Sequence, residues 1–412
     1  GTIRQFFNEH PDKFDPREYL KPARAFETAE YNADWGLKAM HASKAYALGF
    51  TGKGVAVAVM DSGALLSHSE LSGERFVAVE HGGKYSSTGN HYQQGANGVG
   101  DEFGNGDYVA GKDFNVDGNF MPHVNDTHGT HVTGTVGANK DGQGMHGVAF
   151  DANIFVGNSG ATDNNNYGPF QDYNFYYEGW SALANKVRDK NGTLEDGTTL
   201  RGGVINNSFG TNIRYTAKGA SLPVNNVRES EFEYFLFKKN PNPNGKDFVD
   251  AAWDAIQGKN VVQIFTTGNR DMKNPYYRPL YPYFNPDAED QWIAVTGLKQ
   301  LDTTDTNGNP KYDYWYGVNK AGDAKWWTVA APGAKIYSSI VVDDHYVASD
   351  ANHKLGDAGY ATFGGTSMAA PHVAGAMAVL MQRYPDMTAP QVREVMFTTA
   401  NHKNSDGSNF DS

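Results

Sequence analysis

The chain has 412 residues, and its 35 lysines and arginines against 47 aspartates and glutamates leave a formal net charge of −12. This acidic balance argues against nucleic acid or an anionic membrane surface as a partner, because both are negatively charged. The absence of cysteine excludes disulfides, thiolate metal sites and cysteine nucleophiles. No apolar run approaches the 18 residues of a transmembrane helix, so we expect no membrane insertion of this segment.

The first part of the chain predicts an extension, a helix and a buried strand. Residues 1–33 mix aromatic and charged side chains, and we expect them to form an N-terminal extension that packs on the body. Residues 37–48 favour a helix that Gly49 ends. Residues 55–60 are apolar at six successive positions, which is typical of a strand buried on both faces of a parallel sheet.

The same alternation continues along the chain. Further short apolar runs lie at residues 154–156, 204–205, 261–265 and 292–295. Helices are predicted at residues 131–138, 176–188, 248–256 and 367–383. This pattern predicts an α/β fold, with a doubly wound, mostly parallel sheet and helices on both faces. We interpret residues 34–412 as one domain, interrupted by polar, Gly-, Asn- and Asp-rich surface insertions near residues 81–125, 158–175 and 211–246.

Three residues lie where the predicted elements would expose them for chemistry. Asp61 closes the buried strand at its carboxyl end, where open α/β sheets bind ligands. His128 precedes a helix, and Ser367 lies at the start of another helix, whose free N–H groups suit an oxyanion. Each alone has a structural explanation, as a turn carboxylate, a hydrogen-bonded histidine or a helix cap. Together they supply an orienting acid, a general base and a nucleophile.

The motifs around these residues resemble those of the subtilases, the subtilisin-like serine peptidases. The segments are Asp61-Ser62-Gly63, His128-Gly129-Thr130-His131-Val132 and the run of residues 365–375 that begins Gly-Thr-Ser-Met-Ala. Their order along the chain, Asp, His, Ser, is the order known for subtilisin. The resemblance covers residues 31–400 and implies an endopeptidase that works through an acyl-enzyme and requires no cofactor. We expect His131 and His372 to be structural.

More residues carry over from the resemblance by their motifs. Asn269, with Thr266, Thr267 and Gly268 before it, matches the oxyanion segment, so its side-chain amide would stabilise the oxyanion together with the Ser367 N–H. Thr266 and Thr267 stand where the family usually has alanine, and we expect them to line the substrate pocket. The segment Ser208-Phe209-Gly210 resembles the strand that binds the substrate as an added β-strand. We favour an apolar or aromatic residue at the cut site.

Finer similarity, in residues 29–37, 144–149, 205–208 and 282–284, is to the autotransporter subtilases of Gram-negative bacteria. It implies a passenger peptidase that is secreted or held at the bacterial surface and acts on polypeptides. Separately, we expect a monomer. It leaves open a pro-segment removed before Gly1 and a barrel removed after Ser412. The alternative is a catalytically inert, adhesive passenger on a subtilase scaffold. A processing protease, restricted by the insertions, would differ only in its substrate.

Other signals in the sequence are weaker. The resemblance suggests a structural calcium near Glu70 and Asp141, although the family's pattern matches only loosely there. The expression G-x-G-x-x-G at residues 142–147 follows a predicted helix instead of a strand, which argues against dinucleotide binding. Residues 113–118 match half of an EF-hand loop without its bidentate glutamate, and we interpret them as a solvated turn. An α/β-hydrolase is excluded by the order of the three catalytic residue types.

Overall fold

The centre of the protein is a parallel β-sheet in the order β13-β12-β11-β8-β1-β7-β2, with β14 also paired to β12. All of these pairs are parallel except β12 with β13. The computed structural model describes residues 22–89, 93–94, 100–101, 108–160, 169, 172–189, 203–210, 216–217, 220–221, 234–235, 237–238, 242–343 and 353–410. The strands of the sheet are β1 Ala56–Asp61, β2 Phe76–Ala78, β7 Asn153–Asn158, β8 Gly203–Asn207, β11 Val261–Thr266, β12 Trp292–Thr304, β13 Pro310–Tyr314 and β14 Thr328–Pro332.

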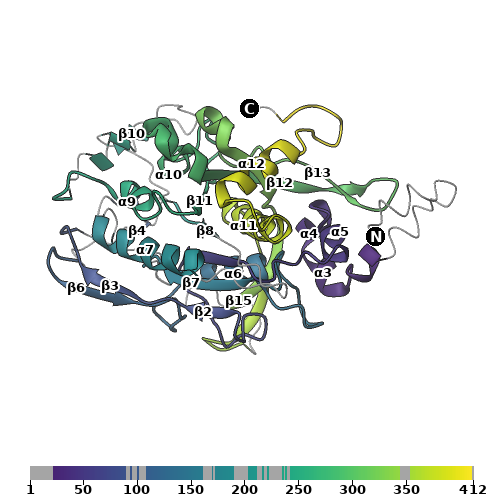
Figure 1. Ribbon diagram of the computed structural model, residues 1–412, viewed down its shortest axis with the longest axis horizontal. Helices are drawn as coiled ribbons and strands as arrows, with labels where there is room; N and C mark the ends of the chain where they lie inside the picture. The colour runs from purple at the N-terminus through teal and green to yellow at the C-terminus, as the bar shows by residue number, and fades with distance from the viewer. Residues whose placement is uncertain are drawn as a thin grey trace.

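Helices cover both faces of this sheet (Figure 1). Val57 and Val59 of β1 point into one hydrophobic cluster, which also holds α6 (His128–Gly137) and α11 (Thr366–Arg383). Ala58 and Met60 point into a second cluster, with α7 (Tyr173–Asp189) and α9 (Phe248–Asp254). The doubly wound α/β fold predicted from the sequence is thereby confirmed, and the apolar run of β1 follows from its burial on both sides.

The remaining elements surround this layered core. They are α3 Ala29–Ala33, α4 Trp35–Ala39, α5 Ala42–Ala47, α10 Tyr277–Phe284, α12 Ala389–Thr399, the 3₁₀ helices Pro286–Gln291 and Gly322–Trp327, and the antiparallel pairs β3 His81–Lys84 with β6 Asp113–Val116, β4 Gln93–Gln94 with β5 Gly100–Asp101, β9 Thr216–Ala217 with β10 Ala220–Ser221, and β15 Ile336–Val341 with β16 Ala358–Phe363. The described part of the predicted extension packs on the body, where Tyr31 is buried against Leu37 and Tyr46.

Two local predictions were wrong. The helix expected over residues 37–48 is two short helices, α4 and α5, because His41 has left-handed backbone angles (φ 57°) that no continuous helix allows. Residues 113–116, expected in a solvated turn, form β6, which pairs with β3 and buries Phe114. The Gly-rich run at residues 142–147 lies between α6 and β7, as predicted.

Several predictions concern segments outside the described residues. These are residues 1–21 of the extension and parts of the three expected insertions, within 90–107, 161–171 and 211–241. The boundary between extension and peptidase domain therefore stays a prediction. Within the described part of the chain, no helix is both long and apolar enough to cross a membrane.

Candidate active site

Asp61 and His128 meet at the carboxyl end of β1. Asp61 is the last residue of this strand and is 2% exposed, and His128 is the first residue of α6. His128 Nδ1 donates to Asp61 Oδ1 over 2.8 Å, and the backbone N–H of Ser62 donates to the same oxygen over 2.7 Å. A carboxylate that receives the Nδ1 proton fixes the tautomer, so His128 Nε2 is left as the basic nitrogen.

Ser62 and Gly129 hold the start of α6 against the end of β1. The Ser62 hydroxyl donates to the Asp126 carbonyl oxygen and accepts the Gly129 N–H, both over 2.8 Å. A Cβ on Gly129 would lie 2.1 Å from the Gly63 carbonyl oxygen, so only glycine allows this approach. Two small residues of the motifs thus bring the imidazole to the carboxylate.

The electrostatics of the pair favour the charged imidazole. Burial lowers the pKa of His128, but the charge of Asp61 and the hydrogen bond to it outweigh burial and raise the pKa to about 9. Asp61 Oδ2 is buried and has no hydrogen-bond partner among the described residues. The arrangement therefore stabilises the imidazolium that forms when His128 accepts a proton.

Ser367 is the second residue of α11, a helix that packs against α6. Its hydroxyl donates to the Ser208 carbonyl oxygen over 2.9 Å, while the Ser208 hydroxyl donates to the Ser367 carbonyl oxygen over 2.8 Å. Among the hydrogen bonds of the described residues, none joins Ser367 to His128. The structure thus brings together Asp61 with His128, and Ser367 with the predicted substrate strand.

Asn269 contacts the residue before Ser367. Its Oδ1 accepts two hydrogen bonds from Thr366, from the backbone N–H over 2.8 Å and from the hydroxyl over 2.9 Å. The Thr366 hydroxyl in turn accepts the Gly268 N–H over 3.3 Å. With Oδ1 held in this way, the exposed amide turns its two Nδ2 protons away from Thr366 and leaves them available to an oxyanion.

The other predicted substrate residues have mixed environments. The Thr267 hydroxyl donates to the Asn319 carbonyl oxygen over 3.0 Å, and the residue is fully buried. Thr266 is buried at the end of β11. Phe209 stacks at 6.4 Å from Trp180. The ring of Tyr276 lies over both Gly210 and Gly268, and a Cβ on Gly268 would lie 2.3 Å from it.

The two other motif histidines are structural, as expected. His131 Nε2 bonds to the carbonyl oxygens of Ile336 (3.0 Å) and Ala361 (3.1 Å). His372 Nε2 lies 2.6 Å from Asp34 Oδ2, with both side chains fully buried. The second pair connects α11 to the residue just before α4.

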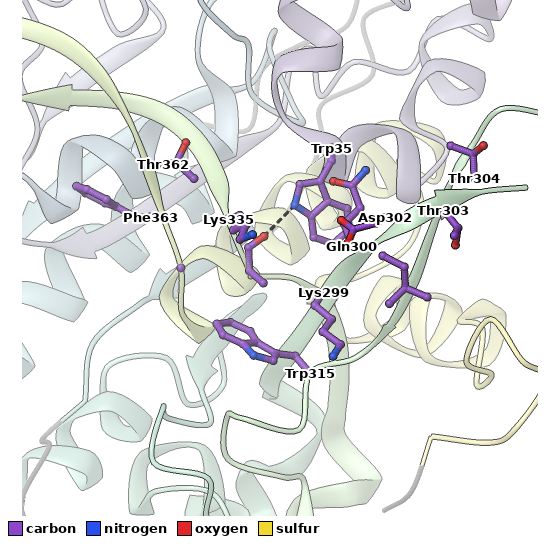
Figure 2. Close-up of a pocket in the computed structure, with 13 residues that line it drawn as sticks. Trp35, Lys299, Gln300, Asp302, Thr303, Thr304, Trp315, Lys335, Thr362 and Phe363 are labelled. Atoms are coloured by element: carbon purple, nitrogen blue, oxygen red, sulfur yellow. Dashed lines mark hydrogen bonds between the residues drawn. The ribbon is translucent and has the colours of Figure 1, made fainter.

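A cavity of about 710 Å³ lies beside the loop that leads to Ser367. Its lining includes Gly364, three residues before Ser367, with Trp35, Trp315 and Asp302. Phe363 also belongs to the lining, but its ring stacks on His131. Figure 2 shows Trp35 and Trp315 approaching the cavity from different parts of the chain, with Lys299 and Lys335 near them. The cavity is therefore walled by aromatic side chains and carries ammonium groups.

Glu70 is the buried acid at the place where a cation was expected. Its side chain is fully buried and interacts with two other side chains, the carboxyl of Asp141 and the hydroxyl of Tyr360. Burial first, and then the negative charge of Asp141, raise its pKa to about 9. The two acids carry oxygen donors of the kind that calcium takes, but the described residues include no group of three or more such side chains that could hold a metal.

Two residues of the site were missed by sequence reasoning. Ser62 and Thr366 stand inside the motifs that were singled out, next to Asp61 and Ser367, and their hydroxyls make the contacts described above. The sequence signal that could have identified them is a hydroxyl-bearing residue directly beside each catalytic candidate. What they contact depends on segments far away in sequence, which the motifs do not reveal.

Comparisons with known proteins identify the family of the chain. Residues 52–411 match the profile of the Subtilase family. An extracellular serine protease of Serratia marcescens is 31% identical over 93% of this chain and 33% of its own length. Subtilisin DY of Bacillus licheniformis is 24% identical, over 89% of this chain and 90% of its own. The Neisserial autotransporter lipoprotein NalP of Neisseria meningitidis is 25% identical, over 85% of this chain and 31% of its own length. The chain thus spans about a third of the length of the Serratia and Neisseria relatives.

Proposed function

The chain belongs to the subtilase family of serine peptidases, and we propose that it is a secreted endopeptidase that cleaves polypeptides with Asp61, His128 and Ser367. The observation that carries the proposal is the 2.8 Å bond from His128 Nδ1 to the buried Asp61 carboxylate. This bond directs the free Nε2 of His128 outward as a base, and the start of α11 carries the hydroxyl that needs one.

In the proposed reaction the Ser367 hydroxyl turns from the Ser208 carbonyl toward His128 and attacks the scissile carbonyl carbon. His128 accepts the hydroxyl proton and returns it to the leaving amine, while Asp61 stabilises the imidazolium. The developing oxyanion receives hydrogen bonds from Asn269 Nδ2 and the Ser367 N–H. Water then repeats the cycle on the acyl-enzyme, and no cofactor takes part in these steps.

The substrate would bind on both sides of Ser367. The segment Ser208-Phe209-Gly210 continues from β8, and an extended peptide added there would pair with its main chain. We propose that the cavity lined by Trp35, Trp315 and Gly364 receives the residues on the other side of the cut, since it borders the Ser367 loop. We propose that the enzyme acts as a monomer, because all of these residues belong to one chain. Secretion is proposed because the relatives are named as extracellular and autotransporter proteins.

A structural calcium at Glu70 and Asp141 remains part of the proposal. The support is the buried side chain of Glu70, which interacts with a second acid, Asp141. A bound cation would offset both charges and stabilise the loop after α6. No step of the reaction depends on it.

The Ser367→Ala variant tests the function. We expect it to fold as the parent does, to lose labelling by a fluorophosphonate probe and to lose casein hydrolysis, whereas Ser405→Ala, a change at an exposed serine, retains both. Casein hydrolysis by Ser367→Ala near the parent rate would contradict the assignment. An unlabelled, inactive but folded parent would instead support the inert, adhesive alternative.

A further inference from the structure

The nucleophile helix contains a proline where a regular helix needs an N–H. α11 begins at Thr366, so Pro371 lies beyond the four positions whose N–H groups have no helical acceptor. In a regular α-helix the N–H of residue 371 would donate to the carbonyl oxygen of residue 367. Because proline has no N–H, the Ser367 carbonyl loses its helical partner.

The Ser208 hydroxyl replaces the missing donor. It donates to the Ser367 carbonyl oxygen over 2.8 Å, and its oxygen accepts a hydrogen bond from Asn206 Nδ2 over 2.9 Å. The amide of Asn206 can only donate through Nδ2, so the hydroxyl proton of Ser208 is directed to Ser367. Asn206 and Ser208 are both buried, at 0% and 1% exposure, which shields these bonds from water.

This contact acts on the backbone of the nucleophile and not on its reacting oxygen. The Ser367 side chain stays free to turn about its own bond, from the Ser208 carbonyl to His128. The backbone of Ser367, however, carries the N–H proposed for the oxyanion, and a 1 Å displacement of a reacting group lowers rates by about 100-fold. A donor on the Ser367 carbonyl therefore sets the position of both the nucleophile and the oxyanion site.

We propose that the Ser208 side chain is a positioning residue for Ser367, required because Pro371 leaves the Ser367 carbonyl without its helical hydrogen bond. This role rests on the proposed function and differs from the peptide binding expected of the main chain at residues 208–210. It assigns to the hydroxyl an effect on turnover, whereas main-chain pairing affects substrate binding.

A double-mutant cycle between Ser208 and Pro371 tests the proposal. Ser208→Ala is expected to lower kcat, and the rate of fluorophosphonate labelling, by about 10-fold with little change in KM. Ser208→Thr, which keeps the hydroxyl, should retain most of the activity. Pro371→Ala restores an N–H that can reach the Ser367 carbonyl, so Ser208→Ala should cost much less in that background. A side chain with a merely structural role would give the same loss in both backgrounds.

Three results would overturn the proposal: a kcat of Ser208→Ala equal to that of the parent, a change in KM alone, or an undiminished loss in the Pro371→Ala background. Thermal unfolding checks that each variant is folded. Should Ser208→Ala not fold, Ser208→Thr against Ser208→Val isolates the hydroxyl at constant shape. A parent that is neither labelled nor active would refute the proposed function itself, which separates the two failures.

Discussion

The contact between Thr366 and Asn269 gives the sharpest prediction about the oxyanion site. Thr366→Val removes the hydroxyl while keeping the branched shape of the side chain. Asn269 Oδ1 then loses its 2.9 Å bond and keeps only the 2.8 Å bond from the backbone N–H. With one of two restraints gone, the amide can tilt away from the oxyanion, so we expect kcat to fall and KM to stay close to that of the parent.

The magnitude follows from the size of one hydrogen bond. A single neutral hydrogen bond contributes about 0.5–1.5 kcal/mol net, which corresponds to a roughly 2- to 10-fold fall in kcat. Losing the Asn269 donor entirely should cost about 100- to 1000-fold, a magnitude already established on a member of this family. Thr366→Val should therefore be much milder than Asn269→Ala.

Steady-state hydrolysis of a peptide p-nitroanilide measures this, with Thr366→Ser as the control that keeps the hydroxyl. In the Asn269→Ala background Thr366→Val should have no further effect, because the group that it orients is absent. Full additivity of the two changes would refute the reasoning. So would a Thr366→Ser variant as slow as Thr366→Val, since the loss would then come from packing and not from the hydroxyl.

Three further predictions follow from the perturbed pKa values. The activity of the parent should rise with pH as His128 loses its proton. Asp61→Asn should move the midpoint of the pH profile of the residual kcat/KM to lower pH, because burial alone lowers the pKa of His128. An unchanged midpoint would contradict this reasoning. Calcium should raise the melting temperature more at pH 8 than at pH 5, because Glu70, whose pKa is raised to about 9, must lose its proton to bind a cation. The melting temperature of Glu70→Gln should not respond to calcium. A response of Glu70→Gln equal to that of the parent would exclude this site. Burial lowers the pKa of His81 to about 4, so the folded state binds fewer protons than the unfolded state, and the free energy of unfolding should fall as the pH drops below 6.5 toward 4. The ring lies among aromatic side chains, Phe114 and Phe175, so His81→Phe should lose less stability over this pH range. Urea unfolding at pH 7 and pH 5 would measure the difference.

Local patterns predicted the sheet because they are caused by local physics. The apolar run of β1 reflects burial on both faces, and Asp61 follows from where that run ends. α12 was missed although its start carries a signal, a capping box between Thr388 and Gln391 with Pro390 in the first turn. α10 gave no such signal, since it contains two prolines and is held by tertiary packing of its tyrosines.

The hydrogen bonds of the site were beyond prediction for a different reason. Asn269 and Thr366 are 97 residues apart, and Ser208 and Ser367 are 159 apart. Whether two such groups meet depends on the order of the strands and on the position of α11 along the sheet. That position must be correct to within about 1 Å for the groups to form their hydrogen bonds. A motif states which groups are present, whereas these distances are set by the packing of the whole domain.

The position of α11 is in fact fixed by contacts from several parts of the chain. Asn269 and Ser208 hold its first turn, and the buried pair of His372 with Asp34 holds its second turn from the N-terminal segment. Burying an ion pair costs desolvation energy, so its loss on one side leaves an unpaired charge. Removal of Asp34 should thus disturb the helix that carries the nucleophile, although Asp34 lies 333 residues before Ser367. We therefore expect residues just after the predicted extension to influence the position of Ser367.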